Sequence, residues 1–339
     1  MLPKLRQAIA ARTHLINADH TAAFRLFSGF YESVPAVVGA PAVVGVPDVV
    51  ADIYARTLLL WGYGDNAEEM EKTLTKVRQY LLDQLPWVEC VVQKQRSAAD
   101  RAQQRGVVTF GDSPAQRVKE HGLWYSVDLT MNQDASFYLD TRNLRRWLID
   151  HAGGWSVYNA FAYTGSLGVA ALAGGASRVV QGDLNRQFLE LARTGGMLNR
   201  LDIGKMKLMA GDFFKQVAQF KGSKTLFDCV IIDPPIFSTT RGGTVDLVNE
   251  STRVINKARP LIRDAGRLIV INNALFLNGA EYARSLDKLC ADGYLTIEEL
   301  IPVPRDITGY PHTITNPPPT NPAPFNHSTK IVVLRVKRK

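Results

Sequence analysis

The second half of the chain alternates short apolar runs with amphipathic segments. Apolar runs rich in β-branched residues predict five buried strands, at 155–161, 177–184, 205–212, 227–233 and 266–273. Helices are expected between them, at 165–173, 186–198, 213–220 and 245–263. This alternation predicts βαβ units, right-handed crossovers and a parallel sheet. A helix at 279–291 and two final strands, antiparallel at the sheet edge, would complete an α/β fold with a seven-stranded sheet.

The first part of the chain is less regular. Residues 1–20 predict a short N-terminal helix, and runs rich in Val, Tyr, Trp and Thr predict several strands after it. One helix is expected at 67–85, where apolar residues recur near the helical period. Strands around a single helix favour a small α+β domain over 21–120, with possible RNA contacts, ahead of a larger domain over 121–339.

Two proline-rich segments interrupt these patterns. The near-duplicated PAVVG units within 34–50 predict a small insertion in a loop or strand, and the three prolines there exclude a membrane helix. The long segment 304–328 separates the last two predicted strands. It is typical of either a rigid surface loop or a lid that contacts substrate.

Composition narrows the class of protein. The chain has 339 residues, 46% hydrophobic, with a net charge of +8, which favours a polyanionic partner, nucleic acid before membrane. Basic residues within 93–105, including Lys94 and Arg96, and the terminal RVKRK are candidate RNA contacts. Three cysteines without CxxC spacing argue against a disulfide framework and a zinc site. We therefore expect no metal, no membrane segment and a cytoplasmic location.

A glycine-containing loop follows the first strand of the second half. In NAFAYTGSLG (159–168), Gly165 and Gly168 would let the backbone approach a ligand at the start of a helix. A dinucleotide fold requires G-x-G-x-x-G here to clear a pyrophosphate. The absence of that pattern disfavours a nucleotide-dependent dehydrogenase.

Acidic residues end the next two predicted strands. Asp183 ends the second strand and is placed to accept hydrogen bonds from two ribose hydroxyls. Asp212 ends the third and is placed to bind an adenine amino group, with Phe213 packing on the base. Ribose and adenine without pyrophosphate indicate S-adenosylmethionine (SAM) as the cofactor.

The fourth strand runs into a stiff turn. Val230 to Ile232 form a buried run, and Asp233, Pro234 and Pro235 end it because proline cannot donate to a sheet. Open α/β sheets bind ligands at the carboxyl ends of their strands. Asp233 and the carbonyl of Pro234 are expected to hold a planar nitrogen, and Phe237 is expected to stack on the base.

These motifs together resemble a known family. FYLDTR (137–142), NAFAYTGS (159–166) and DPPIFSTT (233–240) are similar to segments of class I SAM-dependent methyltransferases of the bacterial 23S rRNA large-subunit type. That group comprises 5-methylcytosine enzymes and a guanine-N7 domain. The resemblance implies a Rossmann-like fold and large-subunit rRNA as the substrate. It implies SAM contacts from Phe161, Tyr163, Thr164, Gly165 and Ser166, and places Tyr138 and Arg142 beside the cofactor or the base.

The choice of methylated atom depends on a cysteine. Cytosine carbon-5 becomes nucleophilic only after a thiolate adds to the ring. The 5-methylcytosine relatives carry a cysteine after the fifth strand, where this chain has Asn272 and Asn273. The paired asparagines resemble the guanine-N7 domain, so a guanine ring nitrogen is favoured. A protein amide or small molecule as acceptor, and a non-catalytic RNA-binding or ribosome-assembly factor, remain alternative hypotheses.

Overall fold

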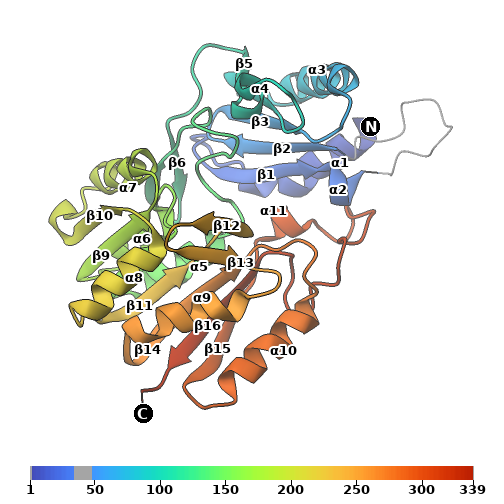
Figure 1. The fold of residues 1–339 in the computed structure, drawn as a ribbon. Coiled ribbons are helices and arrows are strands. Elements are labelled where there is room, and N and C mark those ends of the chain that lie inside the picture. Colours follow the sequence, from blue (N-terminus) through green and yellow to red (C-terminus); the bar gives the residue numbers. More distant parts are fainter. Residues whose placement is uncertain (1, 34–47, 339) are drawn as a thin grey trace. The chain divides into compact units, whose positions relative to one another are not determined.

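The computed structural model describes residues 2–33 and 48–338, which fall into two compact units (Figure 1). The first unit comprises Met1–Leu139 and Pro304–Pro317, and the second comprises Asp140–Val303 and Pro318–Lys339. The division falls after Leu139 rather than near residue 120, and the chain returns to the first unit once. Both PAVVG units lie outside the described residues.

The first unit is built on a five-stranded sheet in the order β1-β2-β3-β4-β5. β3 and β4 are parallel and α3 connects them, while the other neighbours are antiparallel. Apolar side chains of α1 and α3 share one core with this sheet. The elements are α1 (Leu2–Arg12), η1 (Thr13–Leu15), β1 (Ala23–Ser28), α2 (Gly29–Glu32), β2 (Val49–Tyr54), β3 (Thr57–Gly62), α3 (Ala67–Gln84), β4 (Cys90–Gln95), α4 (Arg101–Arg105), β5 (Val107–Phe110), β6 (Arg117–Glu120), β7 (Leu123–Ser126) and α11 (Arg305–Thr308).

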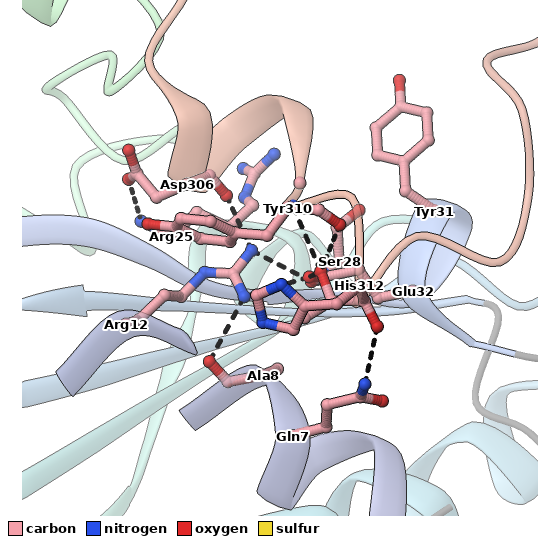
Figure 2. Close-up of polar contacts among 12 residues, drawn as sticks. Gln7, Ala8, Arg12, Arg25, Ser28, Tyr31, Glu32, Asp306, Tyr310 and His312 are labelled. Carbon is pink, nitrogen blue, oxygen red and sulfur yellow. Dashed lines mark hydrogen bonds and ion pairs between the residues drawn. The ribbon is translucent and has the colours of Figure 1, made fainter. Parts of the chain in front are cut away.

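Part of the proline-rich segment is a structural piece of the first unit (Figure 2). Arg12 binds both carboxylate oxygens of Glu32, at 3.0 and 3.1 Å, and donates to the backbone carbonyl of Asp306 at 2.9 Å. The hydroxyl of Thr313 donates to Glu32. The four residues Arg12, Glu32, Asp306 and Thr313, which we call the Arg12 network, are all buried. The network anchors residues 304–317 to α1 and α2, and a contact between this segment and substrate stays a prediction.

A lysine expected to contact RNA lies in the core of the first unit. Lys94 is 0% exposed, and its ammonium donates to the carbonyls of Asn132 and Asp134 at 2.7 and 2.8 Å. Burial lowers the pKa of Lys94 to about 7. The prediction of a phosphate contact at Lys94 is therefore wrong, because a buried amine cannot reach a polyanion.

The second unit contains the seven-stranded sheet, in the order β10-β9-β8-β11-β14-β16-β15. The first five strands are parallel, and β16 runs antiparallel to both β14 and β15, which confirms the predicted antiparallel pair at the edge. The elements are α5 (Arg142–His151), β8 (Ser156–Ala160), α6 (Ser166–Ala173), β9 (Arg178–Asp183), α7 (Arg186–Leu198), η2 (Ile203–Lys205), β10 (Met206–Ala210), α8 (Phe213–Gly222), β11 (Phe227–Ile232), β12 (Phe237–Thr240), β13 (Gly243–Asp246), α9 (Ser251–Ala258), η3 (Arg259–Leu261), β14 (Ile262–Asn272), α10 (Gly279–Cys290), β15 (Leu295–Ile301) and β16 (Lys330–Val336).

Alternate strand residues face opposite sides of this sheet. Tyr158, Val230 and Ile232 share one core with apolar residues of α8, α9 and α10. The intervening residues, such as Val157 and Ile231, are also fully buried, so both faces of the sheet are covered. This arrangement explains why the strands read as continuous apolar runs.

The helix expected at 245–263 is much shorter in the structure. α9 covers Ser251–Ala258, and a two-stranded hairpin, β12–β13, occupies the chain immediately before it. Ile262 already belongs to β14. The backbone N–H groups of Val248 and Asn249 donate to the side chain of Asp246, which makes a turn where the helix was expected to begin.

Candidate active site

The carboxyl ends of the parallel strands lie along one side of the sheet, which we call the sheet edge (Figure 1). In the order β10, β9, β8, β11 and β14, Asp212, Asp183, the loop 161–165, Asp233 and Asn273 lie at or just after these ends. Residues up to 112 positions apart in the chain therefore meet along one edge, where open α/β sheets bind ligands.

The loop after β8 has an unusual backbone. Phe161 and Tyr163 have φ values of 56° and 51°, and Gly165 follows with 73°. Left-handed conformations cost energy in residues other than glycine and are concentrated at functional sites. The backbone N–H of Tyr163 donates to Asp183 at 2.8 Å, which fixes the loop against the end of β9.

The two glycines of this loop have a packing role that the sequence did not show. A Cβ on Gly165 would lie 2.4 Å from the Cβ of Ala192, and one on Gly168 would lie 2.2 Å from the amide nitrogen of Gln181. The glycines therefore allow α6 to approach α7 and β9. We predicted these glycines because a ligand would approach the backbone closely. The contacts within the chain already require glycine at both positions, whether or not a ligand binds.

Asp183 is a half-buried carboxylate at the end of β9. It accepts hydrogen bonds from the backbone N–H groups of Tyr163 and Asn185, at 2.8 and 2.9 Å. Burial raises its pKa, and backbone N–H groups, including that of Leu184, oppose the rise. A carboxylate accepts about four hydrogen bonds, so Asp183 keeps capacity for a ligand hydroxyl.

The side chains of Asp212 and Phe213 already have partners within the protein, which the sequence did not predict. Asp212 caps α8 by accepting from the N–H of Lys215 at 3.0 Å, and the hydroxyl of Thr240 donates to it at 2.5 Å. Phe213 is 5% exposed, belongs to the core, and packs on Phe161 with ring centroids 4.7 Å apart. Asp212 therefore joins the hairpin β12–β13 to α8, and the Phe213 ring faces other protein side chains.

Residues 233–237, which we call the Asp233 corner, follow β11. Asp233 is half-buried and Pro234 is buried, while Phe237 is 64% exposed. Burial raises the pKa of Asp233 to about 8, and the nearby charge of Asp140 contributes to the rise. An acid with this pKa at a strand end is a functional-site candidate with a physical cause.

The two asparagines after the fifth parallel strand play different parts. Asn272 is 0% exposed, donates to the carbonyl of Leu247 at 3.2 Å and accepts from the N–H of Ala274 at 3.0 Å. The amide of Asn272 therefore holds the backbone at Leu247 and Ala274, whereas we expected it to contact a base. The side-chain oxygen of Asn273 is buried and has no hydrogen-bond partner within residues 2–33 and 48–338. A buried acceptor without a partner is costly, which is consistent with a ligand contact.

A buried lysine supports this edge and was not predicted. Lys330 is 0% exposed, and its ammonium donates to the carbonyls of Ala274 and Ser328, at 3.0 and 2.7 Å. Burial lowers its pKa to about 8. The neighbouring Thr329 donates to Asp140 at 2.8 Å. A lysine directly before the apolar run 331–334 was the available sequence signal.

Two residues of the FYLDTR motif fall on either side of the division between units. Tyr138 belongs to the first unit, is 43% exposed and donates from its hydroxyl to Asp134 at 3.3 Å. Arg142 is the first residue of α5 in the second unit. Their expected contacts with cofactor or base stay predictions.

Neither cysteine of the second unit, Cys229 or Cys290, belongs to the Asp233 corner. Cys229 is fully buried within β11, where burial raises its thiol pKa, Cys90 is in β4 of the first unit, and Cys290 ends α10. No cluster of His, Cys, Asp or Glu suited to a metal ion occurs in the described chain. Within the same residues, no helix is both long and apolar enough to span a membrane.

Comparison with known proteins identifies the class. Residues 91–284 match the family model of S-adenosylmethionine-dependent methyltransferases, and the chain belongs to this family. A solved methyltransferase complexed with S-adenosylhomocysteine matches 99% of this chain and 80% of its own, with a TM-score of 0.82 at 20% identity. A SAM-dependent methyltransferase from Streptococcus mutans gives 0.79 at 19% identity, with the same coverage. These likenesses establish the class I methyltransferase fold.

The chain is also similar to curated sequences. It is 26% identical to ribosomal RNA large subunit methyltransferase I of Aliivibrio fischeri, across 87% of this chain and 72% of that one. The protein of the same name from an Enterobacter species is 30% identical, across 69% of this chain and 56% of its own length. The chain is a SAM-dependent methyltransferase.

The residues at the sheet edge fit the cofactor of this family. Asp183 supplies a carboxylate with acceptor capacity, as ribose hydroxyls require. The strained loop 161–165 lies beside it, and the orphan oxygen of Asn273 lies further along the same edge.

Proposed function

We propose that this methyltransferase modifies a base of large-subunit rRNA, and that the acceptor atom is a guanine ring nitrogen. The names of its relatives and the net charge of +8 support an RNA substrate. Such a substrate is found in the cytoplasm, where we place the protein. The observation on which the choice of atom rests is the Asp233 corner, an acidic strand end without a thiol.

We assign the SAM site to the ends of β8, β9 and β10. Asp183 would bind the ribose hydroxyls, and residues 163–166 the methionine end. Asp212 would bind the adenine amino group with the carboxylate lone pairs that Lys215 and Thr240 do not use. Phe161 is half-buried and packs on Phe213, the residue that follows Asp212. SAM supplies an activated methyl group on a sulfonium.

We assign the acceptor base to the Asp233 corner. The carboxyl of Asp233 and the carbonyl of Pro234 would hold N–H groups of the base, and Pro235 fixes the direction of the chain. Phe237, exposed at the start of β12, would stack on the base. Asn273 offers a buried amide oxygen to its edge, while Asn272 holds the loop.

The positions of the cysteines disfavour methylation of cytosine carbon-5. That reaction needs a thiolate within bonding distance of the ring. Cys229 is sealed inside β11 with a raised pKa, so it is not available as a nucleophile. A guanine ring nitrogen such as N7 carries its own lone pair and needs no such partner.

The test uses purified protein, radiolabelled SAM and large-subunit rRNA from a strain that lacks this gene. After digestion, the labelled nucleosides are separated, with the Cys229→Ser variant as a matched control. Label in methylguanosine, retained in Cys229→Ser, is the expected result. Label in 5-methylcytidine would overturn the ring-nitrogen assignment. No label in any RNA, despite SAM binding by calorimetry, would overturn the RNA substrate and favour a protein amide or small molecule.

A further inference from the structure

The first unit contains a cavity of about 260 Å³ outside the sheet edge described above. Its wall is formed by the turn before β1, the starts of β3 and β4 with the residues just before them, and the β6–β7 hairpin with the chain that leads into it. Pockets that enclose drug-sized ligands begin at roughly 300 Å³. A space slightly below that size suits a single planar ring system.

The hairpin presents two cations and an indole on one face. Arg117 and Lys119 alternate with the buried Val118 along β6, and Trp124 on β7 is paired directly with Lys119. The Arg117 guanidinium lies 4.6 Å, and the Lys119 ammonium 5.5 Å, from the centre of the indole ring. Arg117 and Trp124 both line the cavity. Aromatic rings beside cations are the groups that bind single-stranded nucleic acid.

The remaining wall mixes donors with acceptors. Arg56 and Glu89 form an ion pair at 2.5 Å, and Asp19 adds a second carboxylate. A site for a phosphate alone would be cationic throughout, whereas the edge of a nucleobase offers both N–H donors and acceptors. The mixed wall therefore suits a base, and the Arg117–Lys119 edge suits its phosphate.

The cavity is held in shape by its neighbours. The His20 ring stacks on Trp87 at 4.4 Å with an angle of 5° between the planes, and the N–H of Lys119 donates to the carbonyl of Thr21 at 2.7 Å. Nδ1 of His20, buried in this wall, has no hydrogen-bond partner in the part of the chain that the structure describes. A buried ring nitrogen without a partner favours a polar ligand in the cavity, because the ligand would supply the missing hydrogen bond.

We propose that this cavity binds one unpaired nucleotide of the RNA substrate, with its base against Trp124 and its phosphate on Arg117 and Lys119. The inference rests on the proposed RNA substrate and gives the first unit a part in recognising it. It also moves the RNA contact away from Lys94, which is buried, to the exposed face of the hairpin.

The test measures binding of a fluorescently labelled single-stranded oligoribonucleotide, about 8 nucleotides long, to the full chain by anisotropy. Trp124→Leu is expected to weaken binding about tenfold, because stacking of a base on an aromatic ring is lost. Arg117→Gln, at an exposed position that tolerates change, should lower the slope of log affinity against log salt by about 0.7. SAM affinity should stay unchanged in both.

Two matched controls separate this site from general effects. Trp155→Leu removes an indole that also lies near an arginine, 5.7 Å from Arg267, but in the second unit. Lys72→Gln removes an exposed charge on α3 of the first unit. Neither should weaken oligoribonucleotide binding appreciably.

The outcomes distinguish this inference from the proposed function. If the wild type methylates rRNA and binds the oligoribonucleotide, but Trp124→Leu and Arg117→Gln bind like their controls, the cavity assignment is overturned and the function stands. If the wild type binds no oligoribonucleotide and methylates no rRNA, both are overturned. Weakened binding in both cavity variants with intact SAM affinity supports the site.

Discussion

The Arg12 network of the first unit and the sheet edge of the second both contain ionisable side chains removed from solvent, with opposite arrangements. In the network, Arg12 binds both oxygens of Glu32, and Glu32 accepts further bonds from Thr313 and from the N–H of Ser28 (Figure 2). At the edge, Asp233 has a pKa of about 8, raised by burial and by another carboxylate.

The edge also holds a buried lysine whose hydrogen bonds go only to backbone carbonyls among the described residues. Paired buried ions specify structure, and breaking one pair is costly because a charge is left uncompensated. Ionisable groups with shifted pKa values and no ion-pair partner are candidates for functional sites. The network anchors residues 304–317, and we infer from the contrast that the edge is the place of the chemistry.

The largest effect is expected from breaking the network. Glu32→Gln leaves Arg12 buried without its carboxylate, which should lower the free energy of unfolding by about 3–5 kcal/mol. Chemical denaturation followed by circular dichroism measures this loss. Glu68→Gln on α3 is the control, because its partner Lys72 is exposed.

A double variant sharpens this result. Arg12→Met with Glu32→Leu removes both charges, so it should be less destabilised than Glu32→Gln. If Glu32→Gln proved no less stable than Glu68→Gln, the network would not be a structural anchor.

The second prediction concerns Asp233. Asp233→Asn should lower the rate of methyl transfer by at least about a hundredfold, equivalent to roughly 2.7 kcal/mol, with SAM affinity nearly unchanged. The variant should also be more stable than the wild type at neutral pH. The folded pKa, about 8, lies above the unfolded value, so the carboxyl costs the wild type stability as pH rises from about 4 to about 8. Thermal unfolding from pH 5 to 9 measures the widening difference.

Asp228 provides the matched control on the same strand. Hydrogen bonds from Ser156 and Arg263 outweigh its burial and lower its pKa. Asp228→Asn should therefore be less stable than the wild type at neutral pH, and this loss should shrink as pH falls through the lowered pKa. At neutral pH, the change to asparagine would then stabilise the protein at Asp233 and destabilise it at Asp228. An Asp233→Asn variant that kept full turnover would remove the corner from the mechanism.

The third prediction compares the two buried lysines. Lys330→Met leaves two carbonyls without their donor and should cost about 1–3 kcal/mol. Because the folded pKa of Lys330, about 8, lies below the unfolded value, the wild type gains stability between pH 8 and about pH 10 that the variant lacks. Lys94→Met should also destabilise the protein, but only Lys330→Met should impair methyl transfer under conditions where both variants are folded. Equal turnover in the two variants would contradict a role for Lys330 at the edge.

The sequence was sufficient for the features that depend on local pattern. The run from Val230 to Ile232 ends at Asp233, as the two prolines predict, and α7 covers 186–198 despite its internal glycines. The seven-stranded sheet follows from such alternation, because buried parallel strands and their helices differ in period.

Features that depend on distant partners were not visible. In the sequence, Lys94 and Lys330 cannot be told from surface lysines. The backbone carbonyls that accept their hydrogen bonds, such as those of Asn132 and Ala274, are 38 and 56 residues away along the chain. The glycines at 165 and 168 are explained by contacts with Ala192 and Gln181 rather than by a ligand alone. The hairpin β12–β13 takes only residues 245 and 246 from the helix predicted at 245–263, because β13 ends at Asp246.

The smallest effect is expected at Asp183, and it separates binding from chemistry. Asp183→Asn removes the charge that Tyr163 and Asn185 stabilise and halves the acceptor capacity offered to ribose, so SAM should bind roughly tenfold more weakly. Titration calorimetry measures the affinity, with Asp202→Asn as a control, because that exposed aspartate only caps a turn at Gly204. At saturating SAM, Asp183→Asn should recover most of its turnover, while Asp233→Asn should not. If SAM affinity were unchanged, Asp183 would serve only to hold the loop 161–165, and the cofactor site would have to use other groups of the edge.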